Sequence, residues 1–264
     1  MKNVKQLLLA GTVCSMLVFS ACKDDTVDPA GAGSTKTCKI TLATEDDGST
    51  VAYTWDGDLI AKIVESDSDG SVTTYNYNYI AGKLSEIVED GDGDVTTYKI
   101  VYDNDKVSRV DVSESGEVYE YYNVKLNTDG TLMMVDQFNK EDLTDVISAS
   151  YEYTYADGRL QKLKQTYDSD EDGDLDVDDE FLNYKIKAVD DKINPFYGIP
   201  SYFMDFADIL SLTKNNMNAA TIGDDDFELP FTGVYEYNAN NYPTKATMSG
   251  FDETTIIDFT YMCD

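Results

Sequence analysis

Residues 75–87 have the sequence YNYNYIAGKLSEI. Tyrosine occupies every second position starting at Tyr75, and this period of two places the three rings on one face of a β-strand. The Ala-Gly dipeptide that ends at Gly82 is a turn signal, because glycine readily adopts the positive φ that tight hairpins require. Leu84 and Ile87 follow in a segment bounded closely by turns. The stretch therefore predicts one β-hairpin.

The same pattern recurs along the chain with a period of about two dozen residues, which is typical of stacked supersecondary units. Alternating aromatic residues precede four of the five turns, and an apolar pair spaced three apart follows each turn. The pairs are Ile60 and Ile63, Leu84 and Ile87, Val107 and Val110, Leu132 and Val135, and Leu160 and Leu163. Short helices would also fit that spacing, but the segments are too short and too rich in Ile and Val. On a strand the spacing requires a β-bulge or cover on both faces.

The repeats predict an all-β fold, a long antiparallel meander of hairpins with strands of roughly nine to eleven residues. The pattern breaks near Asp190. Residues 200–212 carry apolar side chains at helical spacing and predict one short helix in a C-terminal insertion, while Asn215 and Asn216 suit a cap or turn. We expect a single β-repeat domain over residues 37–264, with hairpin repeats at 37–189 and the helix-containing insertion and closing strands at 190–264.

The composition excludes several chemistries. The 264 residues include no histidine, which excludes Ser-His-Asp and Cys-His catalysis and the usual His-containing zinc sites. The formal net charge of −31 predicts repulsion from nucleic acid and from anionic lipid headgroups. A glycosidase needs only two carboxylates, so that class remains open.

The N-terminus predicts an exported protein. Lys2 and Lys5 precede an apolar stretch at residues 7–19 that is too short for a transmembrane helix, so residues 1–21 are expected to be a signal peptide. Residues 19–22, Phe-Ser-Ala-Cys, resemble the lipobox of bacterial lipoproteins. That resemblance implies that Cys22 is acylated and becomes the mature N-terminus, held on a membrane by its lipid. An ordinary secretory signal is the alternative.

The residues after Cys22 bear on where the protein goes. Lys23, Asp24 and Asp25 resemble the short export signal of Bacteroides-type surface lipoproteins. The resemblance implies an outer-membrane lipoprotein exposed on the cell surface, with a periplasm-facing orientation as the alternative. Residues 22–36 are poor in apolar side chains and predict a lipidated flexible tether.

Longer motifs resemble two families. Residues 77–87 follow the pattern Tyr-x-Tyr, turn, Gly-Lys-Leu-x-x-Ile, and a similar pattern recurs at residues 153–163. This pattern resembles the tyrosine-aspartate repeats of Rhs-type proteins. The C-terminal half is similar to a domain-of-unknown-function family of Bacteroidota lipoproteins, through residues 194–196, 213–216, 235–237, 242–246 and 259–261. These resemblances imply a secreted β-rich lipoprotein and supply no catalytic residue. The chain is far too short for an Rhs toxin shell.

One acidic loop resembles a calcium-binding loop. Asp168, Asp170, Asp172, Gly173, Asp174 and Asp179 match positions one, three, five, six, seven and twelve of the Asp-x-Asp-x-Asp-Gly motif. The loop predicts structural Ca²⁺ bound by Asp168, Asp170, Asp172, Asp174 and Asp179. It departs from the motif in having Asp179 where Glu is usual and strand-like flanks. A solvated acidic hairpin turn is the alternative.

Two cysteines remain for a disulfide. Cys14 leaves with the signal peptide and Cys22 is acylated, so an exported protein keeps Cys38 and Cys263, near the first and last strands. We predict that they are bonded. Packing as two small apolar side chains is the alternative.

The sequence predicts no enzyme. We expect a non-enzymatic structural or binding module that recognises a glycan or a surface protein and does not bind nucleic acid. The 20 tyrosines could stack on sugar rings, although most are expected to pack as core or cross-strand pairs. The competing hypothesis is a glycan-active hydrolase that uses a carboxylate pair.

Overall fold

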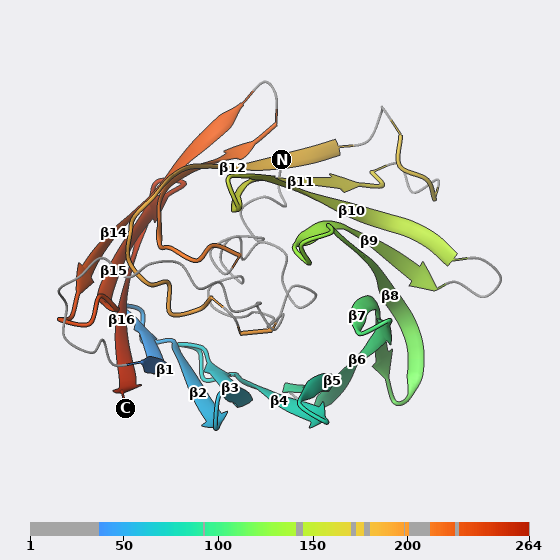
Figure 1. Ribbon diagram of the computed structural model, residues 1–264, viewed down its shortest axis with the longest axis horizontal. Coiled ribbons are helices and arrows are strands. Elements are labelled where there is room, and N and C mark those ends of the chain that lie inside the picture. Colours follow the sequence, from blue (N-terminus) through green and yellow to red (C-terminus); the bar gives the residue numbers. More distant parts are fainter. Residues whose placement is uncertain are drawn as a thin grey trace.

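The computed structural model describes residues 37–91, 93–140, 145–169, 173–176, 180–197, 199–200, 212–224 and 227–263. These residues form sixteen antiparallel strands in one closed barrel, in which each strand pairs with its neighbour in sequence and β1 pairs with β16 (Figure 1). The prediction of an all-β meander of hairpins is confirmed. The predicted helix at residues 200–212 lies almost wholly outside the described residues.

The strands run from seven residues in β2 to twelve in β10, a wider range than the sequence predicts. They are β1 (Cys38–Glu45), β2 (Thr50–Asp56), β3 (Leu59–Ser66), β4 (Val72–Ile80), β5 (Lys83–Gly91), β6 (Asp94–Asp103), β7 (Lys106–Glu114), β8 (Glu117–Leu126), β9 (Leu132–Lys140), β10 (Asp145–Ala156), β11 (Arg159–Tyr167), β12 (Glu180–Val189), β13 (Met217–Gly223), β14 (Glu228–Tyr237), β15 (Pro243–Gly250) and β16 (Glu253–Cys263).

A β-bulge explains the three-residue spacing of the apolar pairs. In the β4–β5 hairpin Tyr79 pairs with Leu84 and Tyr77 pairs with Ile87, but the register shifts by one residue between the two pairs. Ser85 takes up the shift, and its hydroxyl donates to the carbonyl of Asn78 at 2.9 Å. Leu84 and Ile87 therefore both face the tyrosines, and they are 4% and 0% exposed.

The same shift recurs in the other repeats. It lies between Thr54 and Trp55, between Val101 and Tyr102, and between Thr154 and Tyr155, opposite the apolar pairs of β3, β7 and β11. A bulge adds one residue to one strand, so two apolar residues spaced three apart can share a face. Of the two alternatives that the spacing allows, the bulge is thus the one found in these hairpins.

Tight two-residue turns connect the strands in several of the repeats. Ala81 and Gly82 have φ values of 51° and 80°, and Asp157 and Gly158 have 52° and 71°. Two consecutive positive φ values match the right-handed twist of paired strands. The turns therefore hold the hairpins in register, as the sequence predicts.

The barrel has two rims with different connections. The Cys38 rim carries the start of β1, the end of β16 and the connections β2–β3, β4–β5, β6–β7, β8–β9, β10–β11, β12–β13 and β14–β15. The acidic rim carries the alternate connections, from β1–β2 to β15–β16.

Candidate functional site

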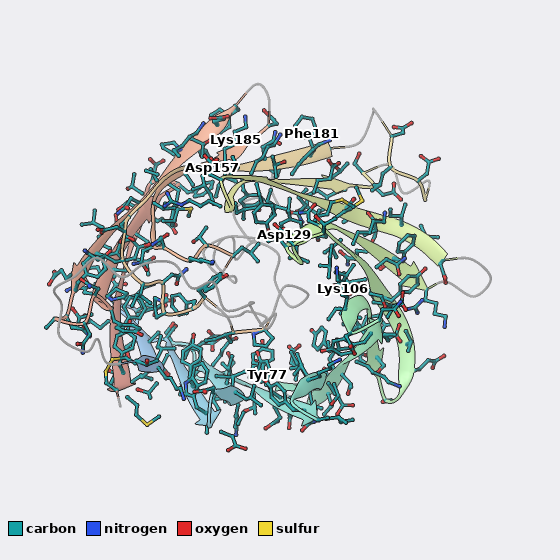
Figure 2. All side chains as sticks on the ribbon, viewed as in Figure 1. Tyr77, Lys106, Asp129, Asp157, Phe181 and Lys185 are labelled. Carbon is teal, nitrogen blue, oxygen red and sulfur yellow. A yellow bond between two sulfur atoms is a disulfide. The ribbon has the colours of Figure 1, made fainter. Side chains whose placement is uncertain are left out.

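The two faces of the barrel wall differ in chemistry. Residues directly opposite each other on paired strands point to the same face, and the register places Tyr77, Ile87 and Tyr98 in one row. Figure 2 shows Tyr77 pointing into the barrel, whereas Phe181 and Lys185 point away from it. The inner row is buried, with exposed fractions of 5%, 0% and 9%. The inner face is therefore the hydrophobic core.

Charged residues follow one another across the outer face. Glu86 pairs with Lys99, and Lys99 pairs with Asp111 on the next strand. Near the C-terminus, Lys245 on β15 pairs with Asp258 on β16. Some outer charges form ion pairs, such as Lys125 with Asp136 at 2.8 Å and Lys185 with Glu228 at 2.6 Å. The outer wall is thus polar along the strands.

Carboxylates and tyrosines also meet on the inner face, nearer the acidic rim. The Tyr98 hydroxyl donates to Glu89 at 2.7 Å, and the Tyr122 hydroxyl donates to Glu120 at 2.5 Å. Gln137 donates to the other oxygen of Glu120 at 2.7 Å. Burial raises the pKa of both tyrosines, and the adjacent carboxylates raise it further. The hydroxyls therefore stay protonated and serve as hydrogen-bond donors to these carboxylates.

Sequence reasoning missed this inner polar layer, although a signal was present. Glu65 follows Ile63 by two residues, and Glu89 follows Ile87 by two. A period of two puts each glutamate on the inner face with its isoleucine. In the structure Glu65 accepts from Tyr75 at 3.3 Å. The glutamates satisfy tyrosine hydroxyls, which is a structural role.

The insertion between β12 and β13 is anchored by a second polar network. Asp190 accepts from the backbone N–H of Asn216 at 3.1 Å, from its side chain at 3.2 Å, and from the Tyr237 hydroxyl. Asn194 donates to the carbonyl of Thr213 at 2.9 Å. Burial and the Asp190 carboxylate raise the pKa of Tyr237. Asn216 is thus held by long-range hydrogen bonds to Asp190, whereas the sequence predicts a local cap or turn there.

An apolar cavity of about 30 Å³ lies between this insertion and the inner face of β13–β16. Phe196 packs there against Phe259 with ring centroids 5.8 Å apart. The lining contains no carboxylate; it consists of Asn194, Pro195, Phe196, Asn216, Met217, Tyr235, Pro243, Ala246, Met248, Ile257 and Phe259. This cavity supplies no acid pair, so the hydrolase alternative stays a prediction.

The predicted calcium loop is described only in part. Asp168 and Asp174 are described, whereas Asp170, Asp172 and Asp179 lie outside the described residues. The backbone N–H of Gly173 donates to the Asp168 carboxylate at 2.9 Å, and Gly173 has a φ of 88°. In the described part of the chain no three His, Cys, Asp or Glu residues are grouped to hold a metal. The Ca²⁺ site therefore stays a prediction.

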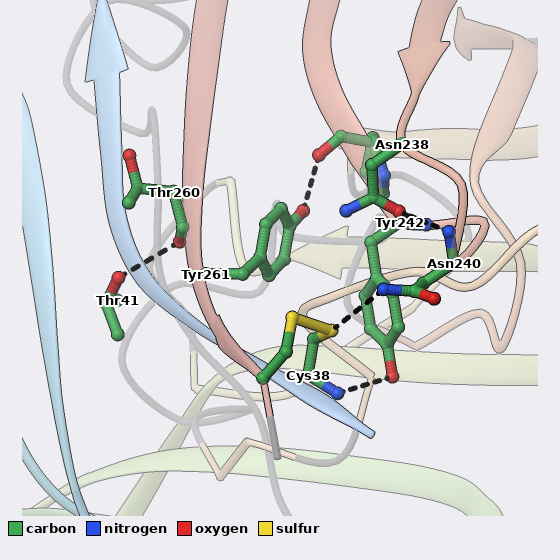
Figure 3. Close-up of a disulfide and its surroundings, with 9 residues drawn as sticks. Cys38, Thr41, Asn238, Asn240, Tyr242, Thr260 and Tyr261 are labelled. Atoms are coloured by element: carbon green, nitrogen blue, oxygen red, sulfur yellow. Dashed lines mark hydrogen bonds between the residues drawn. A yellow bond between two sulfur atoms is a disulfide. The ribbon is translucent and has the colours of Figure 1, made fainter. Parts of the chain in front are cut away.

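A disulfide joins Cys38 to Cys263, the two cysteines that the sequence analysis pairs (Figure 3). The two residues are register partners on β1 and β16. The backbone N–H of Cys38 donates to the Tyr242 hydroxyl at 3.1 Å, and the Tyr261 hydroxyl donates to the Pro243 carbonyl at 2.6 Å. Tyr242 and Tyr261 pack with ring centroids 5.3 Å apart. Hydrogen bonds and rings thus surround the link between the first and last strands.

Cys22, the predicted site of membrane attachment, lies outside the described residues. Within residues that the structure describes, no helix is long and apolar enough to cross a bilayer.

Some solved structures contain a similar barrel. It is similar to a porin-like protein from Bacteroides uniformis, with a TM-score of 0.54 and 14% sequence identity over 84% of this chain and 96% of that one. The barrel fold is shared. A porin-like protein from Bacteroides vulgatus is also similar, with a TM-score of 0.41 and 11% identity over 85% of this chain and 99% of that one. No family model matches the chain, and no curated protein does.

At such low identity the likeness to the Bacteroides uniformis protein extends to the fold alone. The resemblance to tyrosine-aspartate repeats and to a lipoprotein family stays a prediction.

Proposed function

We propose that this protein is a lipid-anchored outer-membrane lipoprotein, in which the barrel stands outside the bilayer as a non-enzymatic binding or structural module. The observation that carries the proposal is the orientation of the two wall faces. Apolar side chains fill the inner face, and charged side chains line the outer face.

A barrel that spans a bilayer needs the opposite arrangement. Its outward face carries an apolar band about 25 Å tall, and each Lys or Arg at the midplane costs about 2 to 4 kcal/mol. Here Lys62, Lys99, Lys164 and Lys185 lie near the middle of β3, β6, β11 and β12, on the outer side of the wall. This wall is therefore suited to water. Attachment then falls to the lipid on Cys22.

The similar Bacteroides uniformis protein is described as porin-like, which is consistent with an outer-membrane location. The lipobox resemblance at residues 19–22 supports attachment to a membrane. Surface exposure rests on residues 23–25. A periplasm-facing orientation remains the alternative, and protease treatment of intact cells separates the two.

A partner of this module would be a glycan or a surface protein. Tyr119 and Phe227 are 41% and 60% exposed, and such rings can stack on a sugar or pack on a protein. The net charge of −31 disfavours nucleic acid. A glycan array and a crosslinking pulldown on intact cells would distinguish the two partner classes.

The anchoring is tested with the full chain expressed in a bacterium supplied with labelled palmitate. We expect the wild-type protein to carry label and to sediment with outer membranes, and we expect Cys22→Ser to lose both properties. Label or membrane association that survives Cys22→Ser would contradict the proposal.

The position of the barrel is tested separately in a planar bilayer. A wall with charged outer residues should insert no stable channel, because its lysines would face acyl chains. Stepwise conductance from purified wild-type protein would identify a spanning barrel and overturn the proposal.

A further inference from the structure

The two rims of the barrel carry very different charge. Acidic residues crowd the connections and strand ends of the acidic rim: Asp46, Asp47, Asp67, Asp69, Asp94, Glu114, Glu117, Asp168, Asp174, Asp176, Glu180, Asp224, Asp252 and Glu253. Among the described residues only Lys140 brings a positive charge to that rim's turns and strand ends. Among the described residues this rim therefore carries a large excess of negative charge.

The Cys38 rim is close to neutral. Its turns, strand ends and insertion carry the bases Lys39, Lys83, Lys106, Arg159, Lys192 and Lys214 beside the acids Asp56, Asp58, Asp103, Asp105, Asp129, Asp157, Asp190 and Asp191. Several of these charges are paired, as in Lys83 with Asp105 at 2.5 Å and Lys39 with Asp58 at 2.7 Å. The repulsion from anionic headgroups that the net charge predicts therefore applies to the acidic rim and only weakly to the Cys38 rim.

Exposed apolar and aromatic side chains also lie on the Cys38 rim. Ile80 is 72% exposed at the β4–β5 turn, and Tyr197 is 47% exposed in the insertion. The Lys214 ammonium lies 5.8 Å from the centre of the Tyr197 ring. Aromatic rings and lysines of this kind suit the boundary between headgroups and acyl chains, because the apolar part can enter while the charge stays in water.

The chain before β1 leaves from this same rim, because β1 begins there at Cys38. Residues 23–37 separate Cys22 from Cys38, and a chain of that length spans at most about 50 Å when fully extended and roughly 20 Å as a flexible coil. The barrel itself is about 20 Å from rim to rim, given strands of about nine residues at the usual tilt. A lipid on Cys22 therefore holds the Cys38 rim within reach of the bilayer.

We propose that the barrel docks on the bilayer by its Cys38 rim, with Ile80, Tyr197 and the neighbouring lysines at the headgroup boundary and the acidic rim turned away from the membrane. The docking rests on the proposed lipid anchor at Cys22. An anionic bilayer favours this orientation, since charges a barrel's height away lie beyond a Debye length of about 10 Å at 0.1 M salt.

The test uses the lipidated full protein in vesicles of phosphatidylethanolamine and phosphatidylglycerol with brominated acyl chains. Trp55 is the single tryptophan, so Trp55→Phe provides a dark background for one probe at a time. Ile80→Trp places the probe on the Cys38 rim. Val95→Trp is the matched control on the acidic rim, where Val95 is 47% exposed.

We expect bromine to quench the Ile80→Trp protein and lipid to shift its emission to the blue, while the Val95→Trp protein shows neither change. Equal quenching of both proteins, or quenching of the Val95→Trp protein alone, would overturn the docking. Each protein must first show the circular dichroism and melting temperature of wild type; should one probe misfold, Met262→Trp and Val72→Trp are a second pair on the same two rims.

A charge test uses the Ile80→Trp probe and changes the bases of the Cys38 rim. Lys106, Arg159 and Lys214 are exposed on the Cys38 rim, and changing all three to Glu should abolish the quenching of the Ile80→Trp protein at 0.1 M salt. Lys140→Glu, on the acidic rim, should leave it unchanged. Unchanged quenching in the triple variant would contradict the role given to these bases.

Flotation of the vesicles separates the two proposals. If wild-type protein fails to float with vesicles, the lipid anchor itself is wrong. If the protein floats but the probes do not differ between rims, the anchor stands and the docked orientation is wrong.

Discussion

The β4–β5 hairpin and the β1–β16 seam are both antiparallel strand pairs, but they are closed in different ways. In the hairpin a two-residue turn, Ala81 and Gly82, joins the strands. In the seam the partners Cys38 and Cys263 are 225 residues apart in sequence. Bringing distant residues together costs more chain entropy than closing a short turn. The hairpin can therefore form from local sequence, whereas the seam depends on the whole barrel and on its disulfide.

The largest expected effect comes from opening the disulfide of the seam. Cys38→Ser with Cys263→Ser should lower the free energy of unfolding by up to about 5 kcal/mol, because the bridge restricts a very long loop in the unfolded chain. Thermal unfolding would then shift down by about 10 °C. Dithiothreitol should shift the wild type equally and leave the double variant unchanged. A reductant without effect on the wild type would show that the seam does not need its bridge.

The hairpin should instead depend on its inner face. Ile87 is 0% exposed, so Ile87→Ala should lower the free energy of unfolding by about 2 to 5 kcal/mol through lost burial and a cavity. Val88→Ala, one residue away on the outer face, is the matched control and should cost less than about 1 kcal/mol. Urea unfolding measures both. Similar losses would mean that the two faces are not distinct.

The β11–β12 connection closes a hairpin through a long acidic loop in place of a tight turn. If Asp168, Asp170, Asp172, Asp174 and Asp179 bind Ca²⁺, a hundredfold excess over the Kd should raise stability by about 2.7 kcal/mol. Melting temperatures in calcium and in chelator measure this. Asp170→Ala with Asp172→Ala should remove the difference. If the wild type has the same melting temperature in both solutions, the loop is a solvated acidic turn that binds no Ca²⁺.

Smaller effects should come from the tight turn itself. Gly82 has a φ of 80°, and a Cβ added there would meet nothing within 4 Å. Gly82→Ala should therefore cost about 1 kcal/mol through backbone strain alone. Ala81 has a φ of 51°, so Ala81→Gly should be neutral or stabilising. A stabilising Gly82→Ala would show that the turn conformation does not hold the hairpin.

The smallest expected effect lies at the other end of the seam, where Glu45 pairs with Ile257. Burial, and then the nearby carboxylates of Asp47, Asp46 and Asp67, raise the pKa of Glu45 from 4.5 to about 7. A raised pKa means that the folded protein binds this proton more tightly than the unfolded chain. Stability from this group is therefore present at low pH and is lost as pH rises through about 7.

Glu45→Gln should then be more stable than wild type at pH 8, by about 1 kcal/mol because Glu45 is partly exposed to solvent. The gain should vanish near pH 4. Glu117→Gln, an exposed acid on the same rim, is the control. A gain that is equal at pH 4 and pH 8 would contradict the assignment.

Parts of the site were open to prediction and parts were not. The inner glutamates follow the isoleucines by two residues, so Glu65 and Glu89 could have been placed on the inner face from sequence. The network of Asp190, Asn216 and Tyr237 could not. Asp190 follows β12, Asn216 precedes β13 and Tyr237 ends β14, and only the folded barrel brings these positions together. Short-range periodicity carries no information about such contacts.

By itself the sequence determined the strands, their turns and the bulged spacing of the apolar pairs, because each depends on a few neighbouring residues and on allowed backbone angles. The sequence also contains no histidine, which excludes histidine-based chemistry, and it leaves Cys38 and Cys263 available for a disulfide. Only the tertiary structure decided that the sheet closes, that the tyrosine face turns inward, and that acids gather on one rim. A period of two separates two faces but does not say which one the sheet curves around, since closure depends on the number, tilt and stagger of all sixteen strands.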